Sequence, residues 1–154
     1  MKNVSYAYQK SRTVLSNVSY MFETGKLYAV LGPSGCGKTT LLSLLGGLDT
    51  PSRGSVFADG ENILAKGLAY HRQNRISLIF QRYNLIDYLT PAENVALTAR
   101  LDAATAGEIT AILRESAHDF GKCAVVATHS DSVALQADVV LEINSMSAMP
   151  VHRS

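Results

Sequence analysis

The sequence predicts an α/β domain with a largely parallel sheet and an N-terminal antiparallel β subdomain. From residue 27 onward, short apolar segments alternate with longer segments of helical periodicity. This alternation is typical of parallel strands joined by helices. Before residue 27, two segments alternate apolar and polar residues, as half-buried antiparallel strands do. The 154 residues, 47% of them hydrophobic, are enough to form a core.

The expected N-terminal element is a β-hairpin with strands at 4–8 and 14–22, joined by a polar loop at 9–12. Residues 23–25 then turn the chain into an apolar run at 27–31. This run has the continuous hydrophobic character of a buried parallel strand. A small sheet therefore leads into the strand from which the main sheet is built.

The segment from Gly32 to Thr39 reads GPSGCGKT and fits the phosphate-binding pattern G-x-x-x-x-G-K-[ST]. It follows the apolar run directly and precedes a helical segment at 40–45. Its glycines allow a tight turn that aims N–H groups at one point, and the helix dipole adds positive potential there. Lys38 then reaches the β- and γ-phosphates and the Thr39 hydroxyl ligates Mg²⁺. The alternative, a glycine-rich turn that matches by chance, is disfavoured by the flanking strand and helix.

Strands and helices are expected to alternate through the rest of the chain. A turn around Pro51 and Gly54 precedes a short strand at 56–58. A helical stretch at 64–74 and a strand at 76–80 follow. Thr90 and Pro91 predict the start of a helix at 92–100.

The last third of the chain repeats this alternation. We expect a helix at 105–118 with Ile109, Ile112 and Leu113 on one face, and a buried strand at 123–127. Ser130 is expected to cap a short helix, and residues 139–143 form the last strand. The domain is expected to span residues 1–143, with a disordered tail at 144–154.

Composition restricts the possible partners. The net charge is +1, from 14 basic and 13 acidic residues, so no nucleic-acid-binding surface is expected. No apolar run approaches the roughly 20 residues that span a bilayer, and no secretory signal is seen at the N-terminus, so we expect a cytoplasmic location. The two cysteines, Cys36 and Cys123, form no disulfide framework. Cys36 either gains reactivity from nearby N–H groups and Lys38, or is a small residue that the loop accommodates.

An aromatic strand, GPSGCGKTT, GLDTPSRG, IFQRYNLI, LDAATAGEI and VVATHS occur in this order along the chain. This series resembles the ATP-binding subunit of ABC transporters, up to about Ile143. The pairing of GLD-x-P-x-x-G with F-Q-x-x-N-L-I is similar to the branch that serves lipoprotein release and peptide or macrolide export. The resemblance implies a P-loop NTPase core that binds ATP and Mg²⁺. It also implies an ABC transporter membrane subunit as partner, at the inner face of the cell membrane.

The resemblance assigns roles to individual residues. Tyr8 matches the aromatic residue that stacks on adenine, with Tyr6 as the fallback if the strand register differs; simple strand packing is the alternative. Gln81 matches a catalytic residue that touches Mg²⁺ and the attacking water, and His129 matches the switch histidine at the γ-phosphate. Ordinary polar roles are the alternative, but both follow expected strands, where ligands bind in open α/β sheets. The implied nucleotide contacts of the loop are Gly32, Ser34, Gly35, Cys36, Gly37, Lys38, Thr39 and Thr40.

Two further segments match parts of the family that face other subunits. Leu101 and Asp102 match the loop that addresses the opposite subunit of an ATP-sandwich dimer. Residues 83–89 resemble the part that faces the coupling helix of the membrane subunit, although their apolar side chains are equally compatible with local packing.

Two elements of the family are missing from the sequence. There is no LSGGQ-type signature and no apolar strand ending in Asp-Glu, the Walker B element; Arg100 runs directly into Leu101. The missing general base argues against productive ATP hydrolysis, by about 10²- to 10⁴-fold in rate, and the missing signature argues against the family's homodimer. In the family's sheet, the Walker B strand lies between the strands that match those ending in Gln81 and His129 here. Its loss either shifts Gln81 by about 4.8 Å, one strand spacing, or exposes apolar edges.

Three functional hypotheses follow. The first is an internally shortened ATP-binding subunit of an ABC exporter. The second is a nucleotide-binding remnant or regulatory module that holds ATP or ADP without turnover. The third, a P-loop enzyme of another kind such as a small kinase, is disfavoured because it requires an acceptor-binding lid and phosphate-binding arginines.

Overall fold

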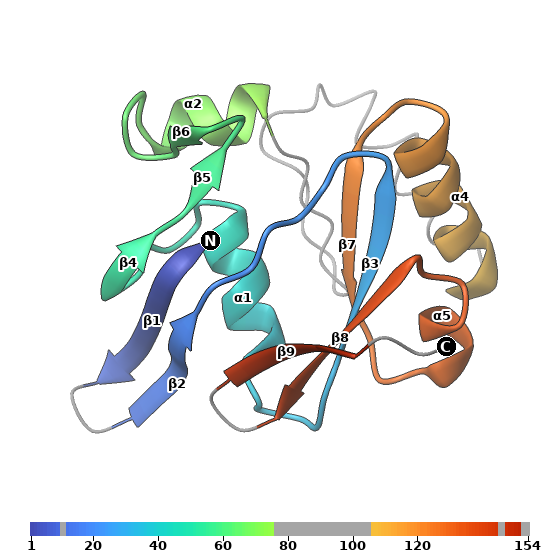
Figure 1. Ribbon diagram of the computed structural model, residues 1–154, viewed down its shortest axis with the longest axis horizontal. Coiled ribbons are helices and arrows are strands. Elements are labelled where there is room, and N and C mark those ends of the chain that lie inside the picture. The colour runs from blue at the N-terminus through green and yellow to red at the C-terminus, as the bar shows by residue number, and fades with distance from the viewer. Residues whose placement is uncertain (10–11, 76–105, 145–146, 152–154) are drawn as a thin grey trace.

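The computed structural model describes residues 1–9, 12–75, 106–144 and 147–151 (Figure 1). The strands are β1 (Lys2–Gln9), β2 (Arg12–Val18), β3 (Lys26–Leu31), β4 (Arg53–Ser55), β5 (Phe57–Ala58), β6 (Glu61–Asn62), β7 (Cys123–Ala127), β8 (Val139–Asn144) and β9 (Ser147–Val151). The helices are α1 (Lys38–Leu45), α2 (Leu68–Asn74), α4 (Ala106–His118) and α5 (Asp131–Ala134).

The main sheet has the order β7-β3-β8-β9. Strand β3 pairs in parallel with β7 on one side and with β8 on the other, and β9 adds antiparallel to β8. A separate antiparallel sheet of order β2-β1-β4 contains the N-terminal hairpin. The predicted fold class, a parallel α/β core with an N-terminal antiparallel subdomain, is therefore confirmed.

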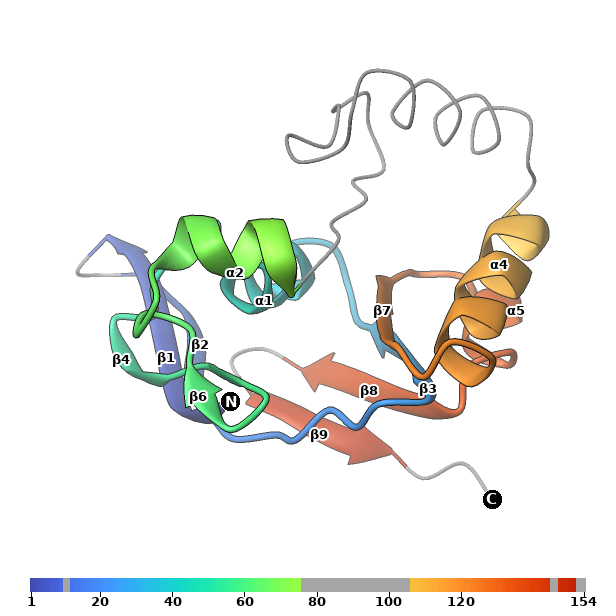
Figure 2. The ribbon, with the colours of Figure 1, turned by 90° about the horizontal axis from the view of Figure 1, so that it is seen from above.

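Alternation along β3 separates the core into two clusters, because successive side chains of a strand point to opposite faces of its sheet. Tyr28 and Val30 belong to a cluster that includes Leu41 and Leu44 of α1 and the inward side chains of β1 and β2. Ala29 and Leu31 belong to the other cluster, with residues of α5 and β8. Figure 2 shows the result, with α1 and the N-terminal strands on one side of β3 and α4 and α5 on the other.

The second strand of the N-terminal hairpin ends earlier than predicted. Strand β2 ends at Val18, whereas the alternating pattern predicted a strand to residue 22. Beyond β2, the rings of Tyr20 and Phe22 pack edge-to-face on Tyr28, with centroids 6.1 Å and 5.0 Å from its centroid. The aromatic residues therefore leave the hairpin because they fill the core beside β3.

Helix α2 begins at Leu68 and not at residue 64 as predicted. The Leu64 N–H donates to Asn62 Oδ1 (2.9 Å), and the Gly67 N–H donates to the Leu64 carbonyl (3.1 Å). These bonds form a turn, and Gly67 then enters the helix with a positive φ of 85°. The Asn62 side chain competes locally with helix formation, which explains the late start.

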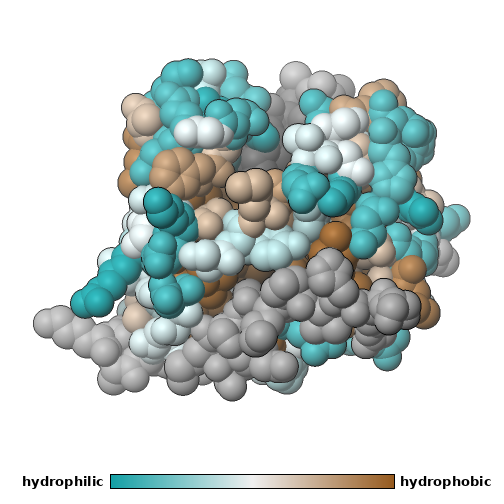
Figure 3. All heavy atoms as spheres, in the orientation of Figure 1, coloured by the Kyte–Doolittle hydropathy of each residue, from teal (hydrophilic) through white to brown (hydrophobic). Residues whose placement is uncertain are grey.

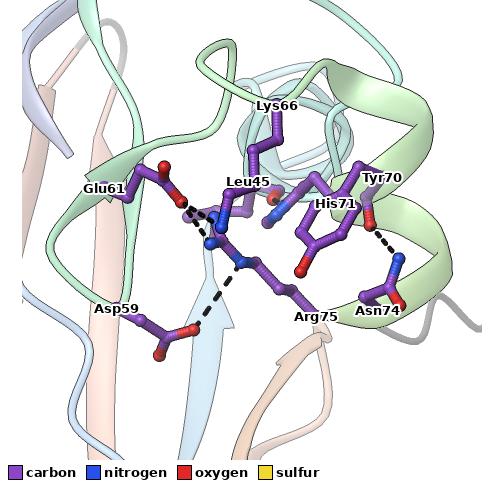
Figure 4. Close-up of polar contacts among 8 residues, drawn as sticks. All are labelled: Leu45, Asp59, Glu61, Lys66, Tyr70, His71, Asn74 and Arg75. Atoms are coloured by element: carbon purple, nitrogen blue, oxygen red, sulfur yellow. Dashed lines mark hydrogen bonds and ion pairs between the residues drawn. The ribbon is translucent and has the colours of Figure 1, made fainter.

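The α2 helix packs on the C-terminal end of α1 (Figure 4). The buried His71 ring donates from Nε2 to the Leu45 carbonyl at 2.9 Å, since a carbonyl only accepts. Arg72 Nη1 donates to the Gly47 carbonyl at 2.6 Å. The Leu45 carbonyl at the end of α1 has no intrahelical partner, so His71 supplies its donor, while Arg72 bonds to the turn that follows α1. The helix that follows the phosphate loop is thus fixed at its far end.

A second group of contacts ties the end of α2 to the β5–β6 hairpin (Figure 4). The Arg75 guanidinium contacts the Glu61 carboxylate and lies 3.8 Å from the Asp59 carboxylate. Lys66 Nζ lies 3.5 Å from the same Glu61 carboxylate, and both cations lie over the Tyr70 ring. Hydrogen bonding by Arg75 lowers the pKa of Glu61.

Helix α4 agrees with the predicted helix at 105–118. Thr110 and Ala117 are the buried centre of its inner face, and Ile109, Ile112 and Leu113 are half-buried around them. In Figure 3, hydrophilic residues cover much of its outer face. The predicted strand at 123–127 and short helix after Ser130 are also observed, although the Ser130 side chain makes no capping hydrogen bond.

The prediction of a disordered tail at 144–154 is wrong for residues 147–151, which form β9. This strand pairs with β8 from Asn144↔Ser147 to Val140↔Val151. The segment is ordered because its main chain pairs with β8. Its composition of small and polar residues did not indicate a strand. The predicted strand at 76–80 and helix at 92–100 lie outside the described residues, so the expected rearrangement beside β7 stays a prediction.

Candidate functional site

The loop between β3 and α1 has the backbone conformation that its glycines predict. Gly32, Gly35 and Gly37 have φ values of 154°, 79° and 109°. Gly32 is also crowded: a Cβ built there would lie 2.6 Å from the Ile143 carbonyl oxygen of β8. Only glycine satisfies both requirements, because other residues rarely adopt these φ values and would collide with the neighbouring strand.

The first turn of α1 presents free backbone donors. Its first main-chain hydrogen bond runs from the Leu41 N–H to the Gly37 carbonyl (2.8 Å), and no side chain caps the helix. Within the described part of the chain, the N–H groups of Lys38, Thr39 and Thr40 have no hydrogen-bond partner. Such N–H groups at a helix start, together with the helix dipole, attract an anion.

The Lys38 ammonium lies against the loop that precedes it. Its Nζ donates to the Gly32 carbonyl at 2.6 Å and to the Pro33 carbonyl at 2.9 Å. Ser34 and Thr39 are exposed on the same loop and helix start. A lysine ammonium is a compact charge on a flexible stem, so exchanging these carbonyls for an anion at the helix start requires only side-chain rotation.

His129 lies at the same edge of the sheet as the loop. Val30 of β3 pairs with Ala127 of β7, and the Thr128 N–H extends this pairing by donating to the Val30 carbonyl (3.0 Å). The chain then turns through the exposed His129, with the Ser130 N–H bonded to Thr128 Oγ1. Because β3 and β7 are parallel, their carboxyl ends place His129 at the same edge of the sheet as the start of the loop, and its role at the γ-phosphate stays a prediction.

The two candidate tyrosines of β1 differ in their surroundings. Tyr8 is 61% exposed, and its hydroxyl lies 3.1 Å from Thr40 Oγ1 on α1. Tyr6 is half-buried against the core, with its ring edge-to-face to Tyr8 at 5.1 Å between centroids. Partial burial and the Asp49 carboxylate raise the pKa of Tyr6. Of the two, Tyr8 therefore offers the accessible ring beside the loop.

Cys36 packs beneath the loop. It is 8% exposed and belongs to the same core cluster as Leu41 and Leu44. Its Sγ lies 3.9 Å from Lys38 Nζ. The Lys38 contact alone would suit a reactive thiol, but the burial of Cys36 in the core cluster favours its interpretation as a small packing residue.

Several predicted site residues lie outside the described residues: Gln81, Leu101, Asp102 and the segment 83–89. Among the residues that the structure describes, no group of three or more His, Cys, Asp or Glu side chains could hold a metal ion. The helices in the described ranges include none that is long and apolar enough to cross a membrane.

Sequence reasoning missed the contact between the Tyr8 hydroxyl and Thr40. Thr40 was predicted as a nucleotide contact and Tyr8 as a stacking residue, but nothing indicated that they touch across 32 positions of sequence. The alternation of aromatic and polar residues in β1 predicts which side chains share a face of the strand, but it does not predict a contact with α1.

A search of family models matches residues 15–148 to the ABC transporter family. The chain belongs to this family. The match begins before the phosphate loop and extends past β8 into β9. The family membership expected from the motifs is therefore confirmed.

Individual relatives support this assignment. The chain is 26% identical over 207 residues to the ABC transporter ATP-binding protein YclH of Bacillus subtilis, covering 93% of this chain and 92% of that protein. It is 41% identical over 113 residues to the methionine import ATP-binding protein MetN of Caulobacter vibrioides, covering 71% of this chain and 34% of that protein. The name of MetN refers to import and that of YclH gives no direction of transport, so the export branch stays a prediction.

The YclH comparison also bears on the internal shortening. Its aligned region of 207 residues is longer than the whole chain of 154 residues, so part of YclH has no counterpart here. Against MetN, by contrast, the chain spans about a third of the relative's length. The YclH comparison therefore agrees with the motif order, which indicates that residues present in the family are missing from this chain.

The solved structure of a bacterial ABC transporter cassette, determined as a dimer, has the same fold. It superposes with a TM-score of 0.77 at 21% identity, covering 99% of this chain and 98% of that chain. A second structure, an ATP-binding cassette in a post-hydrolysis state with ADP and phosphate, gives a TM-score of 0.76 at 22% identity, covering 99% of this chain and 98% of that chain. At these identities the structures establish the P-loop cassette fold.

Proposed function

We propose that this chain is an ATP-binding subunit of an ABC transporter and binds Mg-ATP at the loop between β3 and α1. The observation that carries the proposal is the set of three unpaired N–H groups at the start of α1, with the Lys38 ammonium beside them. Oriented N–H groups and a mobile cation suit a polyphosphate, whose several oxygens accept bonds from both.

In this proposal the loop binds the phosphates and Thr39 helps to hold the metal. Lys38 leaves the Gly32 and Pro33 carbonyls and pairs with the β- and γ-phosphates as a point charge. Thr39 fits as a hydroxyl ligand because it is exposed at the helix start. When bound, Mg²⁺ neutralises phosphate charge, and we propose Gln81 as its second protein contact.

The remaining roles follow from position. The exposed Tyr8 ring stacks on adenine, and His129 hydrogen-bonds the terminal phosphate from the end of β7. The missing Walker B carboxylates remove the general base, so we expect binding with little or no turnover. The partner we propose is a transporter membrane subunit, contacted from the cytoplasmic side at the inner face of the membrane.

Calorimetric titration with Mg-ATP tests the proposal directly. Lys38→Ala should weaken binding at least tenfold, since it removes the only side-chain cation of the loop. The matched variant Lys122→Ala, at an exposed position before β7, should bind as the wild type does. Adding EDTA should weaken binding of ATP by the wild type. Wild-type protein that is folded and shows no magnesium-dependent affinity would overturn the proposal.

The second candidate function is a regulatory module that holds ATP or ADP without turnover, and the missing Walker B element favours it. Phosphate release in the same samples separates the two candidates. Binding without release supports the module. Release that Lys38→Ala abolishes supports an active transporter subunit whose catalytic groups have been replaced.

A further inference from the structure

One polar contact joins the two ends of the proposed nucleotide site. The Tyr8 hydroxyl of β1 and the Thr40 hydroxyl of α1 lie 3.1 Å apart, and either one can donate. Tyr8 is the exposed aromatic residue beside the loop, whereas Thr40 is 3% exposed and lies in the first turn of α1. The bond therefore connects an accessible ring to a fixed point of the helix.

Thr40 has two separate hydrogen-bonding groups with two separate tasks. Its backbone N–H is one of the unpaired donors at the start of α1, which face the proposed phosphate site. Its side-chain hydroxyl is turned to Tyr8. Because the residue is buried, its hydroxyl has little access to water and depends on this partner.

The Tyr8 ring is held from a second side as well. The ring of Tyr6 packs against it edge-to-face, with planes at 88°. Tyr6 in turn packs on the core. A large exposed aromatic side chain loses rotational freedom when it binds a ligand, and fixing it in advance reduces that loss.

We propose that Thr40 is a positioning residue that orients the Tyr8 ring for the base of the bound nucleotide. This inference rests on the proposed function. The chain would then recognise the base and the phosphates as one rigid unit and discriminate an adenine nucleotide from a polyphosphate without a base. The tyrosine hydroxyl, and not only its ring, contributes to this selectivity.

The test compares the dissociation constants of Mg-ATP and of magnesium tripolyphosphate, a ligand without a base. Tyr8→Phe keeps the ring and removes the hydroxyl, so ATP should bind about two- to tenfold more weakly, the usual effect of one hydrogen bond. Tripolyphosphate affinity should not change. Thr40→Val should have the same effect on ATP, while Thr40→Ser should retain wild-type affinity.

The double variant Tyr8→Phe/Thr40→Val decides whether the two hydroxyls act together. We expect it to bind ATP no more weakly than either single variant, because both remove the same bond. Tyr70→Phe, at an exposed position on α2, controls for loss of a phenol hydroxyl in general. Circular dichroism checks that each variant is folded. If Thr40→Val does not fold, the comparison of Tyr8→Phe with the wild type still tests the inference.

The outcomes separate this inference from the proposed function. Wild-type protein that binds neither ligand overturns the proposed function. Wild-type protein that binds ATP, combined with unchanged affinity in Tyr8→Phe or with additive effects in the double variant, overturns the positioning role of Thr40 and leaves ATP binding in place.

Discussion

The glycines on either side of β3 are required for different reasons. Gly32 has both an unusual φ of 154° and a neighbouring carbonyl 2.6 Å from where a Cβ would stand. Gly25, in the turn before β3, also has a positive φ, 76°, but has nothing within 4 Å of that position. A comparison of substitutions at Gly32 and Gly25 therefore separates the energetic cost of steric crowding from that of backbone strain.

Gly32→Ala should therefore destabilise the protein by about 2–5 kcal/mol, from strain plus collision with β8. Gly25→Ala should lose only about 1–2 kcal/mol, the conformational part. Urea unfolding followed by circular dichroism measures both. Equal losses would show that the Ile143 carbonyl moves aside without appreciable energy.

At this scale the sequence predicted which residues surround the loop but not how they touch. The glycine spacing, Lys38 and His129 were readable because a motif and the carboxyl ends of parallel strands define their positions. The crowding of Gly32 by β8 and the bond between Tyr8 and Thr40 were not readable. Both join elements that are far apart in sequence, and no local pattern encodes such contacts.

Among the elements, α2 bonds to the last carbonyl of α1 and to the turn that follows α1. Arg72→Met keeps most of the aliphatic side chain and removes the donor to the Gly47 carbonyl. We expect a loss of about 1–2 kcal/mol in unfolding free energy. Arg53→Met, at an exposed position of β4, is the matched control and should change little. Equal stability of the two variants in thermal unfolding would contradict a stabilising role for the bond between Arg72 and Gly47.

A second junction joins α4, β3 and β8 at the opposite end of the sheet from the loop. Asp138 Oδ2 accepts hydrogen bonds from the Leu27 N–H (2.7 Å) and from His118 Nε2 (2.8 Å). Partial burial alone would raise the pKa of Asp138, but these bonds and the Arg114 charge outweigh it, so the pKa is lowered. The carboxylate therefore favours the folded state.

This lowered pKa gives a defined pH dependence. The stabilisation is present above the unfolded-state pKa, about 3.9, and is lost as the pH falls through the lower folded-state pKa. Asp138→Asn should reduce stability by about 1 kcal/mol at pH 7 and by progressively less toward pH 3. Unfolding with urea across this range measures the difference, and Asp119→Asn, at an exposed position, is the control. A difference independent of pH would contradict the assignment.

Element boundaries show why part of the fold escaped prediction. The strand at 123–127 and the helix at 105–118 were predicted well because each has a clear hydrophobic period. β9 was missed because its order comes from pairing with β8, and α2 starts late because the Asn62 side chain binds the Leu64 N–H. Tertiary pairing and side-chain competition outweigh local propensity at both sites.

For the whole molecule, nucleotide binding should stabilise without assembling a dimer. Mg-ATP at about 100 times its dissociation constant adds roughly 2.7 kcal/mol, which raises the melting temperature by about 5–10 °C. Because the sequence lacks the signature motif, light scattering coupled to gel filtration should show the same mass with and without Mg-ATP. Lys38→Ala should reduce the thermal shift at the same nucleotide concentration, because its affinity is lower. An ATP-dependent doubling of mass would contradict this prediction.

The burial of Cys36 beneath the loop has a practical consequence. Because Cys36 is only 8% exposed, we expect an alkylating reagent to react with its sulfur faster when the loop opens. In a Cys123→Ser background, the rate of alkylation at Cys36 therefore reports how often the loop opens in solution. A nucleotide that keeps the loop closed lowers the fraction of molecules with an open loop, and the alkylation rate falls in proportion. The chain thus contains its own chemical reporter of loop opening.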